Sequence, residues 1–200
     1  MRKKWMPAAF LGLSLLLSAC SSSQDREGIG PCDLSEQEVE LLEAFGIRDT
    51  SQILAFKAPK EAITVSTNVY QLTDDGAWEV IGDGQISIGK EREPVDFLEG
   101  SFVMQLRKDY GIDFRINCAG QASYETEGTV MKQEPLASTR GFLQEFKTIE
   151  LNTEIPVAVM VYDSGTSMQS CGPDDYYEPE KFEGMDLVQA VTLEFSDEEI

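Results

Sequence analysis

The amino-acid sequence predicts a mainly β protein, an antiparallel β-sandwich with one short helix near its N-terminus. Between residues 51 and 200, apolar and polar residues alternate with a period of two in several short segments, as expected for strands that bury one face. Turns rich in glycine and aspartate separate these segments, which favours antiparallel neighbours. One segment before residue 51 has the capping signals and apolar spacing of a helix instead.

Residues 1–19 have the features of an export signal. Basic residues at positions 2–4 precede an uncharged apolar run from Trp5 to Leu17, and small residues follow. The run is shorter than the about 20 apolar residues that a membrane-spanning helix needs, and its basic, apolar and small regions follow the order of a signal peptide. A plain secretory signal followed by a chance cysteine is the alternative.

The sequence Leu17-Ser18-Ala19-Cys20 resembles the lipobox of bacterial lipoproteins. The resemblance implies a diacylglyceryl group on the Cys20 thiol, removal of residues 1–19, and attachment to the outer side of a membrane through fatty acyl chains such as palmitate. One acyl chain alone binds membranes only marginally, so stable anchoring needs at least two. Because Ser21 is not an aspartate, the resemblance implies the outer membrane if the cell is Gram-negative.

Four parts follow from this reading of the chain: a signal peptide (1–19), an acylated cysteine with a flexible tether (20–31), a helical segment (32–50) and a sandwich domain (51–200). The tether is mostly serine, glycine and charged residues, which offer little apolar surface for a core.

The helix is predicted from about Ser35 to Phe45. Ser35 and Glu38 have the spacing of a capping box, and Gly46 supplies the left-handed residue that commonly ends a helix. Leu41, Leu42 and their neighbours give it an apolar face. We expect this face to dock on the domain, and a helix that binds a partner is the alternative.

The predicted strands occupy the rest of the chain, with turns at Asp74-Asp75-Gly76, Gly82-Asp83-Gly84 and residues 108–111. At the end of the chain, Val191, Leu193 and Phe195 alternate with more polar residues, as in a strand with an inner and an outer face. The alternating sets lie within residues 63–70, 78–88, 102–106, 112–116, 157–161 and 188–195.

A weak internal repeat links the two halves of the predicted domain. Phe56-Lys57 recurs as Phe146-Lys147, and Pro94 to Gly100 resembles Pro179 to Gly184. One interpretation is two duplicated β-units that pack face to face. The alternative is that strand–turn–strand segments resemble one another without a duplication.

Composition excludes several kinds of function. The formal net charge is −20 and becomes −23 without the three basic residues of the signal peptide, so we expect no binding to nucleic acid. The chain contains no histidine, which excludes a Ser-His-Asp triad and a histidine-bound zinc ion. We therefore expect no enzymatic activity and no obligatory cofactor.

Three cysteines remain after Cys20. An exported protein favours disulfides, and three thiols allow one bridge with one left over. We expect Cys118 and Cys171 to pair, because Cys32 lies at the edge of the tether.

The segment from Asp163 to Glu180 is the most distinctive predicted loop, because it is long for a connection in a sandwich and long loops often carry function. Tyr176 and Tyr177 could stack on a sugar ring or a partner, or could pack against the sheet. The oxygen-rich set Asp174, Asp175 and Glu178 suits calcium, although ordinary turn chemistry also explains it.

Taken together, these features predict a lipid-anchored extracytoplasmic lipoprotein of the cell envelope that acts as a non-enzymatic binding module for an envelope protein or glycan. One alternative is a carboxylate-based hydrolase of envelope glycans, which would need two carboxyl groups with raised pKa in a cleft. The other alternative is a structural surface protein without a specific ligand.

Overall fold

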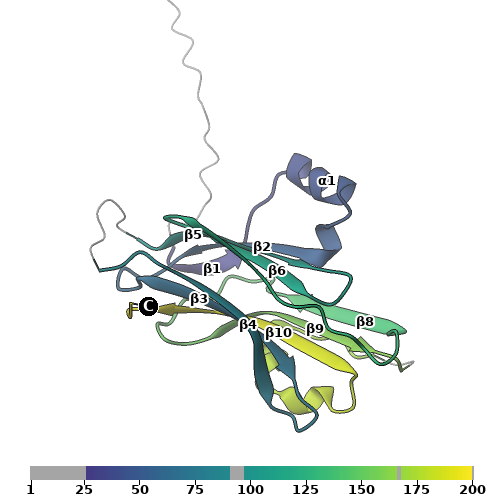
Figure 1. The fold of residues 1–200 in the computed structure, drawn as a ribbon. Helices are drawn as coiled ribbons and strands as arrows, with labels where there is room; N and C mark the ends of the chain where they lie inside the picture. Colours follow the sequence, from purple (N-terminus) through teal and green to yellow (C-terminus); the bar gives the residue numbers. More distant parts are fainter. Residues whose placement is uncertain (1–25, 91–96, 166–167, 200) are drawn as a thin grey trace, which may run out of the picture.

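The computed structural model describes residues 26–90, 97–165 and 168–199 and confirms a mainly β, sandwich-like fold (Figure 1). The predicted signal peptide and lipidated Cys20 lie outside the described residues. In the described part of the chain, no helix has the length and apolarity to cross a membrane.

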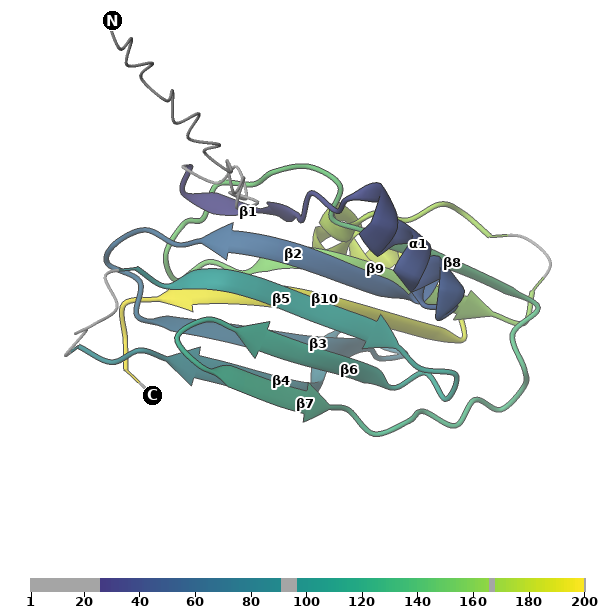
Figure 2. The same ribbon diagram turned by 90° about the horizontal axis from the view of Figure 1, so that it is seen from above.

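Two five-stranded antiparallel sheets face each other (Figure 2). Sheet A has the strand order β1-β2-β5-β6-β7, and sheet B has the order β4-β3-β10-β9-β8. Sheet A contains β1 (Gly28–Pro31), β2 (Ser51–Lys57), β5 (Glu99–Leu106), β6 (Ile112–Asn117) and β7 (Gln121–Glu125). Sheet B contains β3 (Thr64–Leu72), β4 (Trp78–Ser87), β8 (Ala137–Phe142), β9 (Ile155–Asp163) and β10 (Leu187–Ser196).

The main core lies between the sheets, and the predicted alternation places its residues there. Leu193 and Phe195 of β10 point inward and are fully buried, and the Phe195 ring packs edge-on against Phe56 of β2 at 5.2 Å between centroids. Phe102 and Phe114 add two further buried rings from sheet A. Edge-to-face aromatic pairs of this kind stabilise a core beyond the burial of their area.

The sheet edges are partly covered by side chains and loops. At the edge formed by β4 and β7, the Tyr124 hydroxyl donates to the Gln85 carbonyl at 2.7 Å and accepts from the Gln85 amide at 3.1 Å. Gly84 makes this contact feasible, because a Cβ atom there would lie 2.6 Å from the Tyr124 ring. Covering edge backbone groups in this way protects a sheet from pairing with other chains.

Residues 28–31 form β1 and do not belong to the predicted tether. Ile29 exchanges two backbone hydrogen bonds of 2.8 Å with Lys147, on the side away from β2. A side chain on Gly28 would overlap the Phe146 ring, so the glycine that suggested flexibility serves close packing instead.

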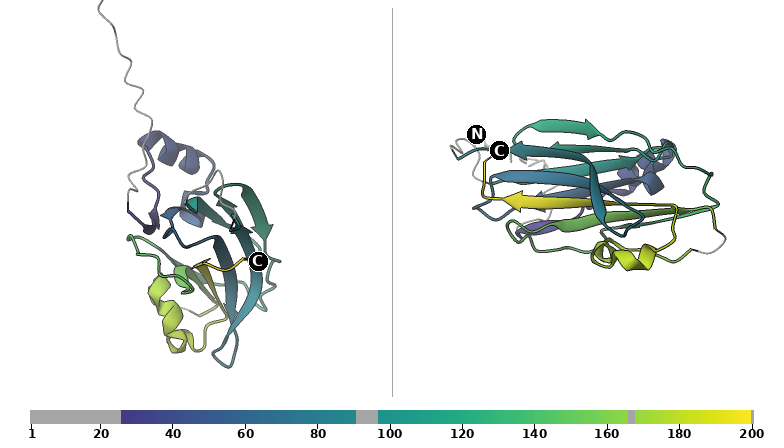
Figure 3. Two further views of the ribbon diagram at one scale, coloured as in Figure 1. Left: turned by 90° about the vertical axis from the view of Figure 1, so that its left-hand side faces the viewer. Right: turned by 60° about the horizontal axis from the view of Figure 1, so that its bottom comes forward.

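A second, smaller layer covers the outer face of sheet B. The segment between β9 and β10 folds back over the sheet and contains two 3₁₀ helices, η2 (Pro173–Tyr177) and η3 (Pro179–Phe182) (Figure 3). Phe182 of η3 packs with Val159 and Val161 of β9 and with Val188 and Ala190 of β10. This cover explains why β9 and β10 are buried on both faces.

The predicted helix exists, but its predicted docking is wrong. α1 (Glu36–Ala44) has the Ser35–Glu38 capping box, and Gly46 has a φ of +66°. Within the described chain no residue of α1 is buried, and Leu41 and Phe45 are 57% and 71% exposed. Figure 1 shows α1 standing off the sandwich. It is followed by a short 3₁₀ helix, η1 (Arg48–Thr50).

The sheets do not divide between the two halves of the proposed repeat. In the first half, β2 and β5 belong to sheet A while β3 and β4 belong to sheet B. In the second half, β8, β9 and β10 all belong to sheet B. The two halves therefore do not correspond to the two sheets, and the duplication stays a prediction. Pro94, which belongs to the repeat, lies outside the described residues.

Candidate functional site

An open groove of about 870 Å³ lies at one end of sheet B. Three segments far apart in the sequence line it: the β3–β4 turn, residues 129–133, and the turn that leads from η3 into β10. Its volume falls in the upper part of the range of about 300–1,000 Å³ that is usual for ligand pockets. We therefore take it as the candidate site.

The first wall is the turn predicted at Asp74-Asp75-Gly76. The Thr73 amide donates to the Ala77 carbonyl at 2.9 Å, and the Gly76 amide donates to the Thr73 carbonyl at 2.9 Å. Gly76 has a φ of +80°, a conformation that glycine adopts without strain. The turn holds both aspartates exposed at the groove.

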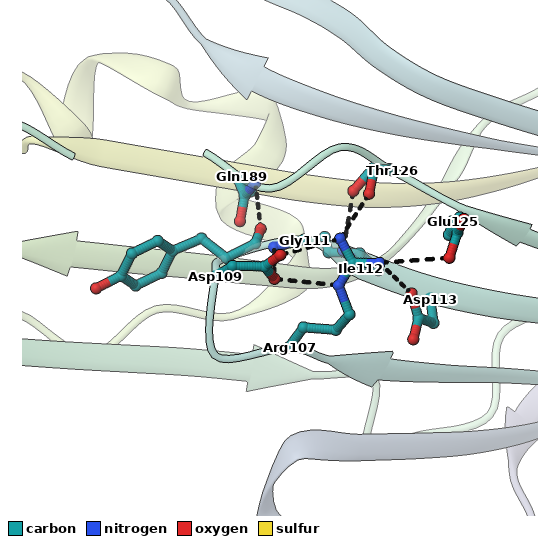
Figure 4. A network of polar contacts seen from close by, with 9 residues as sticks. Arg107, Asp109, Gly111, Ile112, Asp113, Glu125, Thr126 and Gln189 are labelled. Atoms are coloured by element: carbon teal, nitrogen blue, oxygen red, sulfur yellow. Dashed lines mark hydrogen bonds and ion pairs between the residues drawn. The ribbon is translucent and has the colours of Figure 1, made fainter. Parts of the chain in front are cut away.

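The second wall is held by an arginine cluster on sheet A (Figure 4). The Arg107 guanidinium donates to the carbonyl of Thr126 and to the carboxylate of Asp113, both at 2.8 Å, and pairs with Asp109 at 3.1 Å. The Asp109 carbonyl in turn accepts from the Thr129 amide at 2.9 Å. Arg107 thereby holds two points next to residues 129–133: Thr126, which follows β7, and Asp109, in the β5–β6 hairpin, which binds the Thr129 amide.

The β5–β6 hairpin that carries this cluster is joined to sheet B. The buried amide of Gln189, on β10, donates to the Tyr110 carbonyl at 3.0 Å, and the Tyr110 ring packs edge-on against Tyr162 of β9 at 4.9 Å. These contacts place the hairpin at the end of the sandwich where the groove opens.

The third wall is the turn from η3 into β10. Gly184 has a φ of +85°, and the Met185 amide donates to the Phe182 carbonyl at 3.1 Å. The Asp186 carboxylate accepts from the Ser164 amide at 2.6 Å, and hydrogen bonding from the side chain and the backbone of Ser164 holds the pKa of Asp186 below its usual value. The wall is thus tied back to the end of β9.

The groove combines apolar and acidic surface. Leu72, Met131, Phe182 and Met185 supply apolar side chains, and Val130 beside them is 95% exposed. The carboxylates that line it belong to Asp74, Asp75, Glu180, Glu183 and Asp186, and the one basic residue among the lining residues is Lys132. An apolar surface with one sign of charge favours ligands that carry the opposite sign.

The two predicted tyrosines do not form a free stacking surface together. Tyr176 lies against Trp78, with ring centroids 5.2 Å apart and planes at 25°, and its hydroxyl donates to Glu154 at 2.8 Å. Tyr177 is 59% exposed, and its hydroxyl donates to the Glu154 backbone carbonyl at 3.0 Å. The structure therefore gives Tyr176 a packing role and leaves Tyr177 at the surface.

Glu154 is a residue that the sequence did not single out. Its Oε1 accepts from Tyr70 at 2.5 Å and from Thr192 at 2.9 Å, and Asn68 donates to the same atom at 3.1 Å. Burial acts to raise the pKa of Glu154, but the hydrogen bonds outweigh it and hold that pKa below the usual value. The ionised carboxylate joins β3, β10 and η2 on the outer face of sheet B.

The acids predicted to bind calcium are paired with lysines. Asp175 and Glu178 both contact the Lys181 ammonium at 2.8 Å, and Asp174 forms an ion pair with Lys147. Among the described residues, no cluster of three or more carboxylate, thiol or imidazole groups has an arrangement that could hold a metal ion.

The predicted disulfide is not formed, because Cys118 and Cys171 are free thiols in the structure, as is Cys32. Cys118 packs against the core between the sheets, whereas Cys171 packs against the outer cluster, where its thiol donates to the Val159 carbonyl at 3.4 Å. Sheet B thus separates the surfaces that the two side chains contact. Burial raises the pKa of Cys171 and makes its thiol less reactive.

Comparison with known proteins finds no matching family model, no matching curated protein and no matching solved structure.

Proposed function

We propose that this chain is a lipid-anchored binding module on the outer side of a bacterial membrane, without enzymatic activity, and that the groove at the end of sheet B is its binding site. The groove is the observation that carries the proposal. Its three walls are fixed by hydrogen bonds and by the Arg107 cluster, so the site is formed before a ligand arrives, as is usual for binding pockets.

The lipobox-like sequence supports the location. Arg26, the first described residue, is six residues after Cys20. A fully extended chain of that length spans about 20 Å, so a lipid on Cys20 would keep the domain close to the membrane surface.

The alternative function, a hydrolase with two carboxyl groups of raised pKa in a cleft, is not supported by Glu154 and Glu194. Burial and the charge of Glu154 raise the pKa of Glu194, but the pKa of Glu154 itself is lowered and its oxygens accept four side-chain hydrogen bonds. A carboxylate that is occupied in this way acts as a structural acceptor and has little capacity left for a substrate. Neither residue lines the groove.

The location is tested by intact-mass analysis of the protein from the membrane fraction of cells that express the full chain. We expect a chain that begins at Cys20 and carries a diacylglyceryl group, and we expect globomycin to accumulate the uncleaved precursor. The Cys20→Ala variant should lose the lipid and leave the membrane fraction. A cytosolic wild-type chain that retains residues 1–19 would contradict the proposal.

The binding site is tested by a thermal-shift screen of peptides and glycans with a groove-filling variant. Val130→Trp fills the groove from an exposed position, and Val80→Trp is the matched control on the exposed part of β4. A ligand at 100 times its Kd adds about 2.7 kcal/mol, or about 5–10 °C in Tm for a domain of this size. We expect this shift in Tm for wild type and for Val80→Trp, and no such shift for Val130→Trp, in which the groove is filled. Ligands that stabilise Val130→Trp equally would place binding elsewhere.

A further inference from the structure

We infer that the groove binds an extended peptide segment that carries lysine or arginine next to an apolar residue. This inference rests on the proposed function and names the chemistry of its ligand.

The groove carries acidic side chains that have no ion-pair partner among the described residues. Asp74, Glu180 and Glu183 line it and are exposed, and none of the three forms an ion pair among the residues that the structure describes. Their negative charges are therefore left for a ligand to balance, which favours a cationic one.

Other acids in the segment between β9 and β10 differ from Glu180 and Glu183, because they are paired with lysines. Asp174, Asp175 and Glu178 lie a few residues before Glu180, but each is paired with Lys147 or Lys181. Lysines thus pair with these three acids, whereas Glu180 and Glu183 of the same layer form no ion pair among the described residues. Lys132 faces the groove, where its charge helps to hold the pKa of Asp186 low.

The groove also has an apolar surface, which favours a ligand with apolar side chains. Met131 and Met185 are partly exposed there, above the buried Phe182. Methionine side chains are flexible and polarisable, and they suit surfaces that adapt to more than one apolar side chain. A small polyamine would satisfy the carboxylates and leave this surface in water, whereas a peptide with both cationic and apolar residues covers both parts.

The test uses fluorescence anisotropy with the mature lipidated protein in neutral detergent. The probe is a labelled heptapeptide that alternates lysine and leucine. Two control peptides replace all lysines with glutamate or all leucines with serine. We expect binding of the first peptide, no measurable binding of the glutamate peptide, and at least tenfold weaker binding of the serine peptide.

Two triple variants with equal loss of charge locate the interaction. The groove variant is Asp74→Asn, Glu180→Gln and Glu183→Gln, and we expect it to weaken binding at least tenfold. The control variant replaces Glu40, Glu145 and Glu150 with glutamine, exposed positions outside the groove, and should change affinity less than twofold. Higher salt should weaken binding to wild type and remove most of the difference between the variants.

The outcomes separate the two proposals. Equal affinity of both triple variants, or tight binding of the glutamate peptide, would overturn the cationic ligand. If a neutral glycan or acidic peptide then bound wild type but not Val130→Trp, the groove would stand as the binding site with a different ligand class. If Val130→Trp changed the affinity of no ligand, both the inference and the proposed site would be wrong.

Discussion

The Tyr176 hydroxyl donates a hydrogen bond of 2.8 Å to the Glu154 carboxylate and so fixes η2 on the outer face of sheet B. Three further side chains, on β3 and β10, donate to the same carboxylate. One acid thus connects the outer layer with the sheet, and that layer continues through η3 into a wall of the groove.

Replacing Glu154 with alanine should destabilise the fold. The change leaves four donors without their acceptor, and we expect the free energy of unfolding to fall by about 2–4 kcal/mol. Acidification should cause a similar loss of stability, because the pKa of Glu154 is lowered in the fold. The contribution of the ionised carboxylate to the free energy of unfolding is fully present above the unfolded pKa of about 4.3. It is lost as the pH falls through the lower folded pKa. Urea unfolding checks this, with the exposed Glu150→Ala as control, expected within about 0.5 kcal/mol of wild type.

Alkaline pH should loosen the same contact. Burial and the Glu154 carboxylate raise the pKa of Tyr70 to about 12, above the unfolded value of about 10. The stability from its hydroxyl is therefore present below pH 10 and is lost as the pH rises through about 12.

The indole of Trp78 reports this change directly. It stacks on Tyr176 and donates to the Tyr176 carbonyl at 2.9 Å, and the sequence has one other tryptophan, Trp5, in the predicted signal peptide. Trp78 emission of the mature chain should stay constant from pH 6 to 9 and change as the pH rises through about 12. In Tyr70→Phe this transition should be smaller; an identical transition in that variant would show that Tyr70 is not its source.

Polar substitutions on α1 should leave the fold intact. Leu41 and Phe45 are mostly exposed and α1 has no buried residue among those described, so Leu41→Ser with Phe45→Ser should change the free energy of unfolding by less than about 0.5 kcal/mol. Phe114→Ala, in the core, is the contrasting control and should cost about 3–5 kcal/mol. A loss of more than about 2 kcal/mol in the α1 variant would mean that the helix packs on the domain in solution.

Removing the Arg107 guanidinium should loosen the second wall of the groove. Arg107→Ala takes away the donors to Thr126, Asp109 and Asp113, and we expect a loss of about 1–3 kcal/mol. Hydrogen exchange should accelerate at the Thr129 amide, which donates to Asp109, while the Val191 amide in β10 serves as a reference. Arg107→Lys should restore this protection only in part, because an ammonium lacks the planar fork; unchanged exchange in Arg107→Ala would show that the wall is held by other contacts.

The sequence predicts several strands that bury one face, but it misses β2, which also buries one face, and the strands that do not alternate clearly. The sets around Val65, Phe102 and Phe114 lie in β3, β5 and β6 because their apolar residues meet a core on one side. β7 and β8 are edge strands whose described side chains are exposed or half-buried, so they show little hydrophobic pattern. β1 consists of Gly28–Pro31, a composition that is typical of a linker. It forms a strand because it pairs with β2 and its glycines pack closely against Phe146.

Helical periodicity identifies α1 and its caps because these are local properties, but it does not reveal whether another element covers the apolar face. The same limit applies to the acids of the long loop. Asp174 and Glu178 suit calcium when they are considered alone, yet Lys147 and Lys181 reach them in the fold. Lys147 is 27 residues away in the chain, and nothing in the local sequence indicates that contact.

The groove escapes prediction for a related reason. The turn at Asp74-Asp75-Gly76 is correctly predicted from its residues, but it forms a binding surface only where residues 129–133 and the turn before β10 lie beside it. Only the end of the predicted contact loop, Pro179 and Glu180, lines the groove. Tertiary topology brings these parts together, and a single sequence does not contain that information in readable form.

The most direct measurement is a titration of the isotope-labelled mature chain with the lysine–leucine peptide, followed by two-dimensional amide spectra. We predict chemical-shift changes concentrated at residues 72–76, 129–133 and 183–188, and their loss in Val130→Trp. Changes centred instead on α1 or Tyr177, or spectra that the peptide leaves unaltered, would contradict the assignment of the groove as the binding site for a cationic peptide.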